Sequence, residues 1–321
     1  MTDNALQPLS TSQLLDRTFS LYKDNFPVFA GIAALPPAMV ALVQVLALPL
    51  GNDTTAAKDL SVAVIVVAAI IAIVFVIIYL LGLALANGAT VFAVSRLHLG
   101  SSASIGESYK IVRPLLGRII NIVVSASIRS MGPALLAYLV FLLLIVGSSA
   151  GMRSLGGAGG AIFGLLFLAA FGLVIAGGIW SFRLYLSYSL AIPVCIVEKL
   201  RAKECLRRSK ILTKGSLTRI FLVYLLFGII TFAFSLVLSI PNYLDVATHE
   251  GVQTLPFKIW SVVADFLSGT LAGPVATIAV ALLYYDERVR KEAFDLQLMM
   301  ESMRATGPSQ PHPAPAPPSI S

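Results

Sequence analysis

One stretch decides the fold: Glu198-Lys-Leu-Arg-Ala-Lys-Glu-Cys-Leu-Arg-Arg-Ser-Lys-Ile-Leu-Thr-Lys-Gly-Ser-Leu-Thr-Arg219. It holds eight of the 23 Lys and Arg residues of the chain, and the flanking runs 184–197 and 220–244 contain no charged residue. Moving Lys or Arg across a bilayer costs several kcal/mol, so such a cluster stays on the cytoplasmic side of a membrane. The stretch therefore predicts how a membrane protein would be oriented.

Composition points to the same class of protein. The mean hydropathy is +0.88, and only 12% of the residues are charged, against roughly 25% in soluble domains. The net charge is +7. Because the basic residues lie at the ends of apolar runs, we expect them to meet anionic membrane lipids, or a membrane-protein partner, and not nucleic acid.

Six apolar runs are long enough to cross a bilayer, which needs about 20 residues. They lie within 27–50, 60–95, 119–146, 160–197, 220–240 and 256–285. Six crossings place 18 Lys and Arg residues on the side of both termini and three on the other side, Lys58, Arg153 and Lys258. This asymmetry predicts that both termini lie on the cytoplasmic side of a plasma (inner) membrane.

Local features within the runs predict kinks and contacts. Pro36-Pro37 predicts a kink in the first span, and Gly132-Pro133 predicts a break in the third. Residues 60–95 read as one long helix, in which Asn87-Gly88 marks a buried contact. Gly269, Gly273 and Thr277 are spaced four apart in the last run, which allows close approach of helices.

Three short amphipathic helices are expected on the membrane surface, each before a pair of spans. The first has a capping box at Ser10–Gln13 and an apolar face of Leu15, Phe19, Tyr22 and Phe26; the second has a box at Ser104–Glu107. The third is the basic stretch itself and has no capping box. Acidic residues recur at equivalent places, Asp16, Glu107 and Glu204. The pattern predicts three repeats of a surface helix and a transmembrane hairpin.

The chain divides into three parts by composition. Residues 1–12 form an N-terminal tail, 13–300 an all-α membrane domain of six spans, and 301–321 a proline-rich tail that we expect to be disordered. The two cysteines, Cys195 and Cys205, lie at a cytoplasmic end of a span, where we expect free thiols that pack as small apolar side chains.

Two arginines and one glutamate are candidate polar groups within the membrane: Arg129, Arg183 and Glu198. Arg183 follows Trp180 and precedes two tyrosines, so it can extend to the aromatic interface. The alternative is that Arg183 faces a polar cavity and pairs with Glu198 or with a lipid phosphate. Arg129 has the same two interpretations.

Basic side chains of the central stretch are candidate contacts with lipid headgroups: Lys203, Arg207, Arg208, Lys210 and Lys214. The simpler interpretation is that they determine topology and rest on the membrane surface. The functional alternative is recognition of a specific anionic lipid or a partner, since each basic residue contributes about 1 kcal/mol near an anionic surface.

Catalytic, metal and cofactor motifs are not expected in this chain. The three histidines, His98, His249 and His312, are assigned to the cytoplasm, the exterior and the tail, so they cannot form one metal site. The sequence has no GxSxG elbow and no P-loop. We therefore expect no enzyme activity.

Three segments resemble a known family. They are Leu15-Asp-Arg-Thr-Phe-Ser-Leu-Tyr-Lys-Asp-Asn-Phe26, Ala191 to Glu198 together with Leu206 to Gly215, and Leu282 to Asp295. These segments resemble the membrane domain of glycerophosphoryl diester phosphodiesterases and the uncharacterised bacterial multi-pass membrane proteins related to it. In family members whose membrane domain is fused to a catalytic domain, hydrolysis belongs to that separate domain. It is a TIM barrel of about 250 residues that opens with His-Arg-Gly. This chain lacks that motif, so the resemblance implies the membrane part alone.

The sequence favours an accessory or scaffold role in which the protein binds lipids or a membrane partner. The main alternative is a transporter of a small solute or a lipid, and a lipid-modifying enzyme comes third. A polar cavity lined by Arg129, Arg183 or Asn87 would favour transport. A core packed by Leu and Gly would favour the scaffold.

Overall fold

The computed structural model describes residues 9–48, 62–151, 156–249, 253–292 and 300. Throughout these ranges the regular structure is helical and contains no strand. Five helices are long and apolar enough to cross a membrane, and the number is six if the bent pair near the N-terminus forms one span. The prediction of an all-α, multi-pass membrane protein is confirmed.

The order of the helices follows the predicted repeat. Each of the surface helices α1, α5 and α9 precedes two spans, with the bent pair α2 and α3 forming the first of them and the short helices η3 and α8 serving as connections. The elements are α1 (Thr11–Asp24), α2 (Phe26–Ala33), α3 (Leu35–Ala47), α4 (Val62–His98), α5 (Ile105–Val112), η3 (Arg113–Leu115), α6 (Leu116–Gly151), α7 (Gly156–Tyr188), α8 (Ala191–Glu198), α9 (Ala202–Thr213), α10 (Leu217–Thr248) and α11 (Leu255–Glu292).

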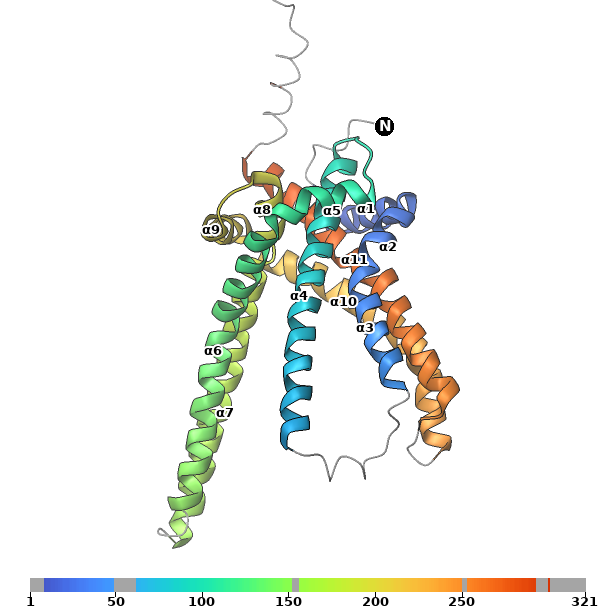
Figure 1. Cartoon of the computed structure of the whole chain (residues 1–321). Coiled ribbons are helices and arrows are strands. Elements are labelled where there is room, and N and C mark those ends of the chain that lie inside the picture. The colour runs from blue at the N-terminus through green and yellow to red at the C-terminus, as the bar shows by residue number, and fades with distance from the viewer. Residues whose placement is uncertain (1–8, 49–61, 152–155, 250–252, 293–299, 301–321) are drawn as a thin grey trace, which may run out of the picture.

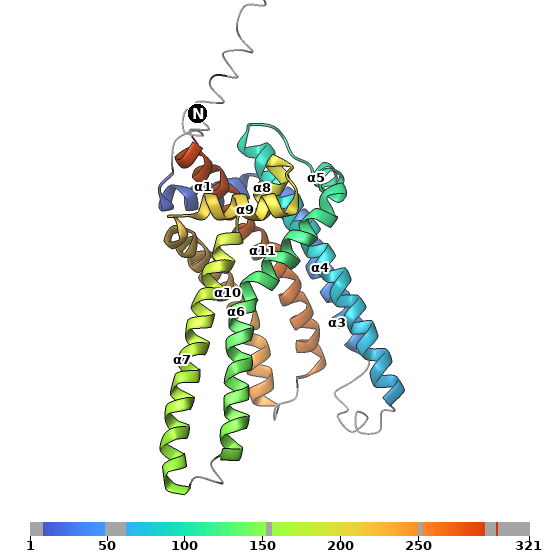
Figure 2. The ribbon, with the colours of Figure 1, turned by 90° about the vertical axis from the view of Figure 1, so that its left-hand side faces the viewer.

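The surface helices gather at one end of the spans, where they form a layer (Figures 1 and 2). Each one begins at a polar cap. Ser10 forms the expected reciprocal box with Gln13, and Ser104 Oγ accepts the N–H of Glu107 at 3.3 Å. In α9 the Glu204 carboxylate accepts the N–H of Arg201 at 3.0 Å. This half of a capping box was not predicted, because arginine is not a usual N-cap residue.

The buried side of α1 is displaced by one residue from the predicted apolar face. Leu14 and Thr18 are the buried side chains, whereas Phe19 and Phe26 are each 42% exposed. A helix that lies on a membrane packs one side on the protein and turns an apolar side to the lipid. The spacing of Leu15, Phe19 and Phe26 found the apolar side, and only the structure distinguishes it from the packed side.

The first span bends at its two prolines. Helices α2 and α3 meet at an angle of 47°, just before Pro36 and Pro37. Proline has no N–H to donate, so Pro36 leaves the Ile32 carbonyl without its usual helical partner. The Tyr109 hydroxyl of α5 donates to that carbonyl at 2.5 Å. A surface helix of the second repeat thus stabilises the kink in the first.

The break predicted at Gly132-Pro133 is wrong. Helix α6 continues through Pro133 to Gly151. The N–H of Ala134, the residue after the proline, donates to Ser181 Oγ of α7 at 2.9 Å. Gly177 of α7 lies so close that a Cβ there would be 2.7 Å from the Cβ of Ala137. Packing against α7 therefore supports a continuous α6 despite its proline.

Helix α11 is the centre of the molecule. More than half of its most apolar window, 56%, is buried, against at most 17% in the other four long helices. It packs against α10, α3, α4, α2 and α1. Gly269 contacts Pro37, and Thr277 bonds Asn87, so two of the three spaced residues lie at contacts as predicted. Gly273 has no neighbour within 4 Å of a Cβ.

Candidate functional site

The exposed face of α9 is basic, as the sequence predicts. Its buried face consists of Cys205, Leu206, Ser209, Leu212 and Thr213. The exposed basic residues on the other side are Lys203, Arg207, Lys210 and Lys214. Four cations on one exposed face can meet an anionic surface.

Arg208 differs from these four residues. Its side chain is only 28% exposed, and it forms ion pairs with Glu198 of α8 at 3.3 Å and with Glu292 of α11. The assignment of Arg208 to the lipid-facing set is therefore corrected. Its guanidinium is held between two carboxylates, where it joins α9 to the end of α11.

Glu198 lies in this same ion cluster at the end of α8. The Tyr284 hydroxyl donates to its carboxylate at 2.9 Å, and Arg288 lies 4.0 Å away. Arg183, the partner considered from the sequence, is exposed on α7. The ion pairs of Glu198 in the described chain are with Arg208 and Arg288, and Arg183 is not among them.

A second ion cluster holds the N-terminal segment to α11. The Asp286 carboxylate has no exposed surface and accepts the N–H of Leu9 at 2.5 Å, as well as bonds from Arg219 and Arg290. The neighbouring Glu287 accepts the Ser216 hydroxyl at 2.7 Å. The sequence analysis did not identify Arg219 as a partner of this cluster, because nothing local in the sequence links Arg219 to Asp286 and Glu287.

The two thiols lie together beneath α9. Cys195 and Cys205 are both free and buried, as predicted. Their side chains are hydrogen-bonded to each other, and this bond, together with burial, raises the pKa of the Cys205 thiol above its usual value. Since the thiolate is the reactive form, Cys205 is a poor nucleophile in this environment.

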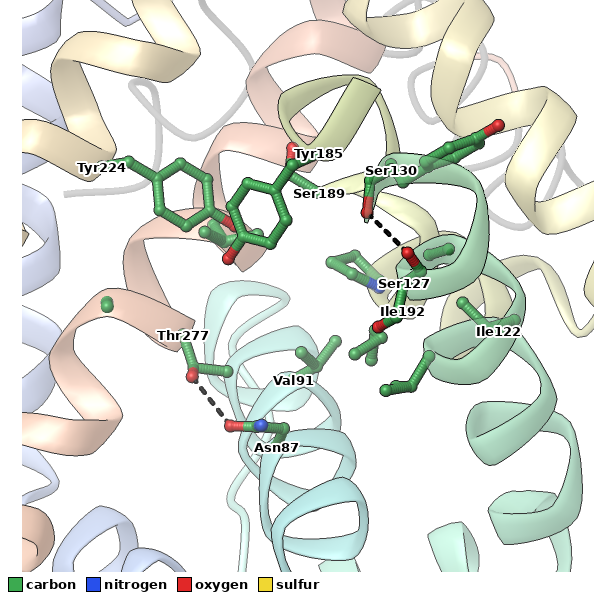
Figure 3. Close-up of a pocket in the computed structure, with 16 residues that line it drawn as sticks. Asn87, Val91, Ile122, Ser127, Ser130, Tyr185, Ser189, Ile192, Tyr224 and Thr277 are labelled. Carbon is green, nitrogen blue, oxygen red and sulfur yellow. Dashed lines mark hydrogen bonds between the residues drawn. The ribbon is translucent and has the colours of Figure 1, made fainter. Parts of the chain in front are cut away.

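A pocket of about 310 Å³ lies below the surface layer (Figure 3). Its walls come from α4, α6, α7, α8, α10 and α11. The lining residues are Asn87, Val91, Ile122, Val123, Ala126, Ser127, Ser130, Tyr185, Tyr188, Ser189, Ile192, Pro193, Tyr224, Ala276, Thr277 and Val280. Asn87, which the sequence singled out, lies here, whereas Arg129 and Arg183 do not.

Polar groups enter the pocket from three directions. The Thr277 hydroxyl of α11 donates to Asn87 Oδ1 of α4 at 3.1 Å. The rings of Tyr185 and Tyr224, from α7 and α10, pack edge to face with centroids 6.0 Å apart. On the α6 side, Ser130 Oγ donates to the Ser127 carbonyl at 3.2 Å. Figure 3 shows these groups around a common space.

Exposure distinguishes the mouth of the pocket from its wall. Val123, Ser127 and Tyr185 are exposed, whereas Val91 and Pro193 are buried. The pocket therefore opens beside α6 and α7 and is closed beside α4 and α8. The arrangement is a pocket among the spans with one open side.

Helix α9 is bonded to the wall of the pocket. Ser209 Oγ donates to the Ser187 carbonyl at 2.8 Å, and Thr213 Oγ1 donates to the same carbonyl at 3.3 Å. Lys210 Nζ lies 5.0 Å from the centroid of Tyr188, which lines the pocket. These contacts place the basic helix directly over the break between α7 and α8.

Fold and site together define an all-α, multi-pass membrane protein with a pocket among its spans. Comparison of the chain with protein-family models, with curated proteins and with solved structures finds no match to any of them. Within the described ranges, no group of three or more His, Cys, Asp and Glu side chains is arranged to hold a metal ion.

Proposed function

We propose that the protein is a membrane carrier that binds a small solute or a lipid headgroup in the pocket between its spans. The observation that carries this proposal is the polar lining contributed by helices from all three repeats. Side chains that can form hydrogen bonds are costly in a bilayer unless they have partners. Their convergence on one space of about 310 Å³ favours a ligand site over a simple packing role.

The helices around the pocket also have the irregularities common in carriers. The run from 156 to 198 breaks at Ser189 and Leu190, and Ser189 lines the pocket. Binding sites of transporters are often built from such discontinuous helices. Tyr185 of α7 contacts Tyr224 of α10, so a movement of the α6–α7 hairpin would change the pocket.

Native mass spectrometry tests the carrier proposal. The full chain is extracted into nanodiscs from its own membrane, and any bound small molecule is identified. Ala126→Trp places a large ring in the pocket, and Leu143→Trp, at a 72% exposed position of the same helix, serves as its matched control. We expect a stoichiometric ligand on wild type and on the control, and its loss from Ala126→Trp. Equal occupancy in all three proteins would contradict the proposal.

A second candidate function is an accessory role in which α9 binds an anionic lipid or a membrane partner. The observation that favours it is the set of four exposed basic side chains, Lys203, Arg207, Lys210 and Lys214. If each contributes about 1 kcal/mol, together they bind an anionic lipid more tightly than the lipids of the surrounding bilayer. The two candidates are compatible, because α9 is bonded to the wall of the pocket.

Lipid retention tests the accessory role. The four basic residues are changed to Gln, with Arg208 left in place, and co-purifying anionic lipid is quantified by mass spectrometry. Lys110 of α5 and Arg113 of η3, both exposed, are changed to Gln as a control. We expect the α9 variant alone to lose its lipid. Equal loss from both variants would contradict a specific role for α9.

We also propose, as an inference from the resemblance, that the chain is related to the membrane domain of glycerophosphoryl diester phosphodiesterases and has no catalytic activity of its own. The three resembling segments lie in α1, in α8 and α9, and at the end of α11. They meet through Glu198–Tyr284 and Arg208–Glu292, and α1 packs on α11. Contact among the segments supports a shared structural unit.

The orientation is a further part of the proposal: a bacterial inner membrane with both ends in the cytoplasm. Leu9 bonds Asp286, so the first and last described segments lie on the same side of the spans. This contact supports an even number of crossings. The basic residues of α9 and of the end of α11 lie in the same layer, which supports the cytoplasmic assignment for that side.

A further inference from the structure

The pocket has an unusual property for a site that is bordered by so basic a layer. Of the residues that the structure describes, the 16 that line the pocket include no Asp, Glu, Lys, Arg or His. Arg129 and Arg183, the arginines of the neighbouring helices, are exposed and do not line it. We propose that the pocket selects an uncharged ligand that carries hydroxyl groups, either a free polyol or the headgroup of a neutral lipid. This inference rests on the proposed carrier function.

Charge is the first argument for this class of ligand. A carboxylate or phosphate that leaves water is destabilised unless a cation or several hydrogen-bond donors compensate it. Two cations of α9 already have partners: Arg208 pairs with Glu198 and Glu292, and Lys210 lies over the ring of Tyr188. An anionic ligand would find no free cation among the lining residues.

Hydrogen-bonding capacity is the second argument. Serine, threonine and tyrosine hydroxyls both donate and accept, and the asparagine amide provides both kinds of atom. The pocket has this chemistry in Asn87 and Thr277, in Ser127 and Ser130, in Ser189, and in Tyr185 and Tyr224. A hydroxyl group of a ligand is likewise both donor and acceptor, so several such groups can be satisfied at once. An anionic group that only accepts hydrogen bonds cannot bond to the acceptor atoms of the pocket.

Shape is the third argument. A volume of about 310 Å³ suits a headgroup or a small polyol and is too small for a complete diacyl lipid. Tyr185 and Tyr224 present ring faces and edges next to their hydroxyls (Figure 3). On the open side, Val123 is apolar and 37% exposed, which allows an acyl chain to continue into the bilayer.

Two matched pairs of probes test the selectivity of the full chain in detergent by native mass spectrometry. The first pair is monooleoylglycerol and oleoyl lysophosphatidic acid, which differ by one phosphate. The second is myo-inositol and inositol 1-phosphate. We expect binding of an uncharged member and at least tenfold weaker binding of its phosphorylated counterpart. Binding of monooleoylglycerol alone identifies a lipid headgroup as the ligand, and binding of myo-inositol alone identifies a free polyol.

Point variants connect that selectivity to the pocket. Tyr224→Phe removes one hydroxyl, and we expect a loss of affinity of about three- to tenfold for the uncharged ligand. Tyr243→Phe, on the same helix at a 65% exposed position, is the control and should have no effect. Ser127→Arg introduces a cation at the mouth and should increase binding of the phosphorylated probe by about tenfold.

The outcomes separate this inference from the carrier proposal. If a phosphorylated probe binds wild type as tightly as its neutral counterpart, and Ala126→Trp abolishes both, selection against charge is refuted while the pocket remains a ligand site. Failure of all four probes to bind also overturns the inference. If a probe binds and Ala126→Trp leaves its affinity unchanged, the pocket is not the site and both proposals fail.

Discussion

At the scale of single residues, buried carboxylates hold together the end of the structure where the surface helices gather. The Asp286 side chain is fully buried and receives the Leu9 N–H and two arginines. Asp286 and Arg290 are four residues apart on one helix, a spacing that favours an ion pair, and they lie 2.8 Å apart. The bond to Arg219 could not be predicted, because it depends on how α10 and α11 pack. Local periodicity thus finds contacts within one helix and misses those between helices.

Removing the charge of Asp286 is expected to destabilise the protein. Asp286→Asn leaves Arg219 and Arg290 without their shared carboxylate, and breaking one partner of a buried pair costs about 3 kcal/mol. The measurement is reversible unfolding in detergent, followed by circular dichroism. Asp265→Asn, on the same helix but exposed, is the control, and we expect it to change the free energy of unfolding by less than about 0.5 kcal/mol. Equal effects would contradict the central role of Asp286.

The Cys205 thiol is expected to resist alkylation. Its hydrogen bond with Cys195 and its burial raise its pKa, so at neutral pH it stays protonated, and the thiolate that attacks a maleimide is scarce. Labelling by N-ethylmaleimide, followed by mass spectrometry, should be slow in the folded protein and complete in dodecyl sulfate. Lys203→Cys, exposed on the same helix, should be labelled within minutes. Rapid labelling of native Cys205 would show that α9 is not packed as described.

At the scale of helices, the prolines show where sequence reasoning succeeds and where it fails. Pro36-Pro37 predicted a bend, and the first span bends by 47°. Gly132-Pro133 predicted a break, yet α6 is continuous, with Ser181 of α7 accepting the N–H of Ala134. The outcome depends on which neighbour satisfies the freed backbone groups. That neighbour belongs to another helix, so the local sequence does not contain the answer.

The kink between α2 and α3 should depend on a tyrosine from α5. Tyr109→Phe removes the donor to the Ile32 carbonyl, which Pro36 leaves without its helical partner. Leaving a buried carbonyl unsatisfied costs about 1–3 kcal/mol. Thermal unfolding in detergent measures the loss, and Tyr138→Phe, 50% exposed on α6, is the matched control. If the two variants unfold at the same temperature, the bond does not stabilise the kink.

At the scale of the whole molecule, three repeats build one layer of surface helices and one pocket. The sequence predicted the number of spans, their order and the surface helices, because apolar length and charge are local properties. Of the pocket it predicted only Asn87. Tyr185 and Tyr224 are 39 residues apart in sequence and meet only when α7 and α10 pack. A site formed between helices takes its residues from several apolar segments, so no single segment of the sequence shows a pattern for it.

The described fold predicts which positions share a side of the membrane. On a cysteine-free background, Ser102→Cys and Lys203→Cys lie in the surface layer, whereas Ala247→Cys lies near the far end of α10. A membrane-impermeant maleimide added to spheroplasts should label Ala247→Cys, and added to inverted vesicles it should label the other two. Labelling of all three from one side would mean that α10 does not cross the bilayer.

The measurement that most directly tests the account is electron cryomicroscopy of the full chain in nanodiscs formed from its native membrane. The account predicts that the pocket persists and holds density for a small ligand between Asn87, Tyr185 and Tyr224. Ligand density without a peak of the size of a phosphate would agree with an uncharged ligand. A collapsed core, in which α6 and α7 pack closely on α4 and leave no space beside Asn87, would contradict the carrier proposal and leave the basic face of α9 as the functional surface.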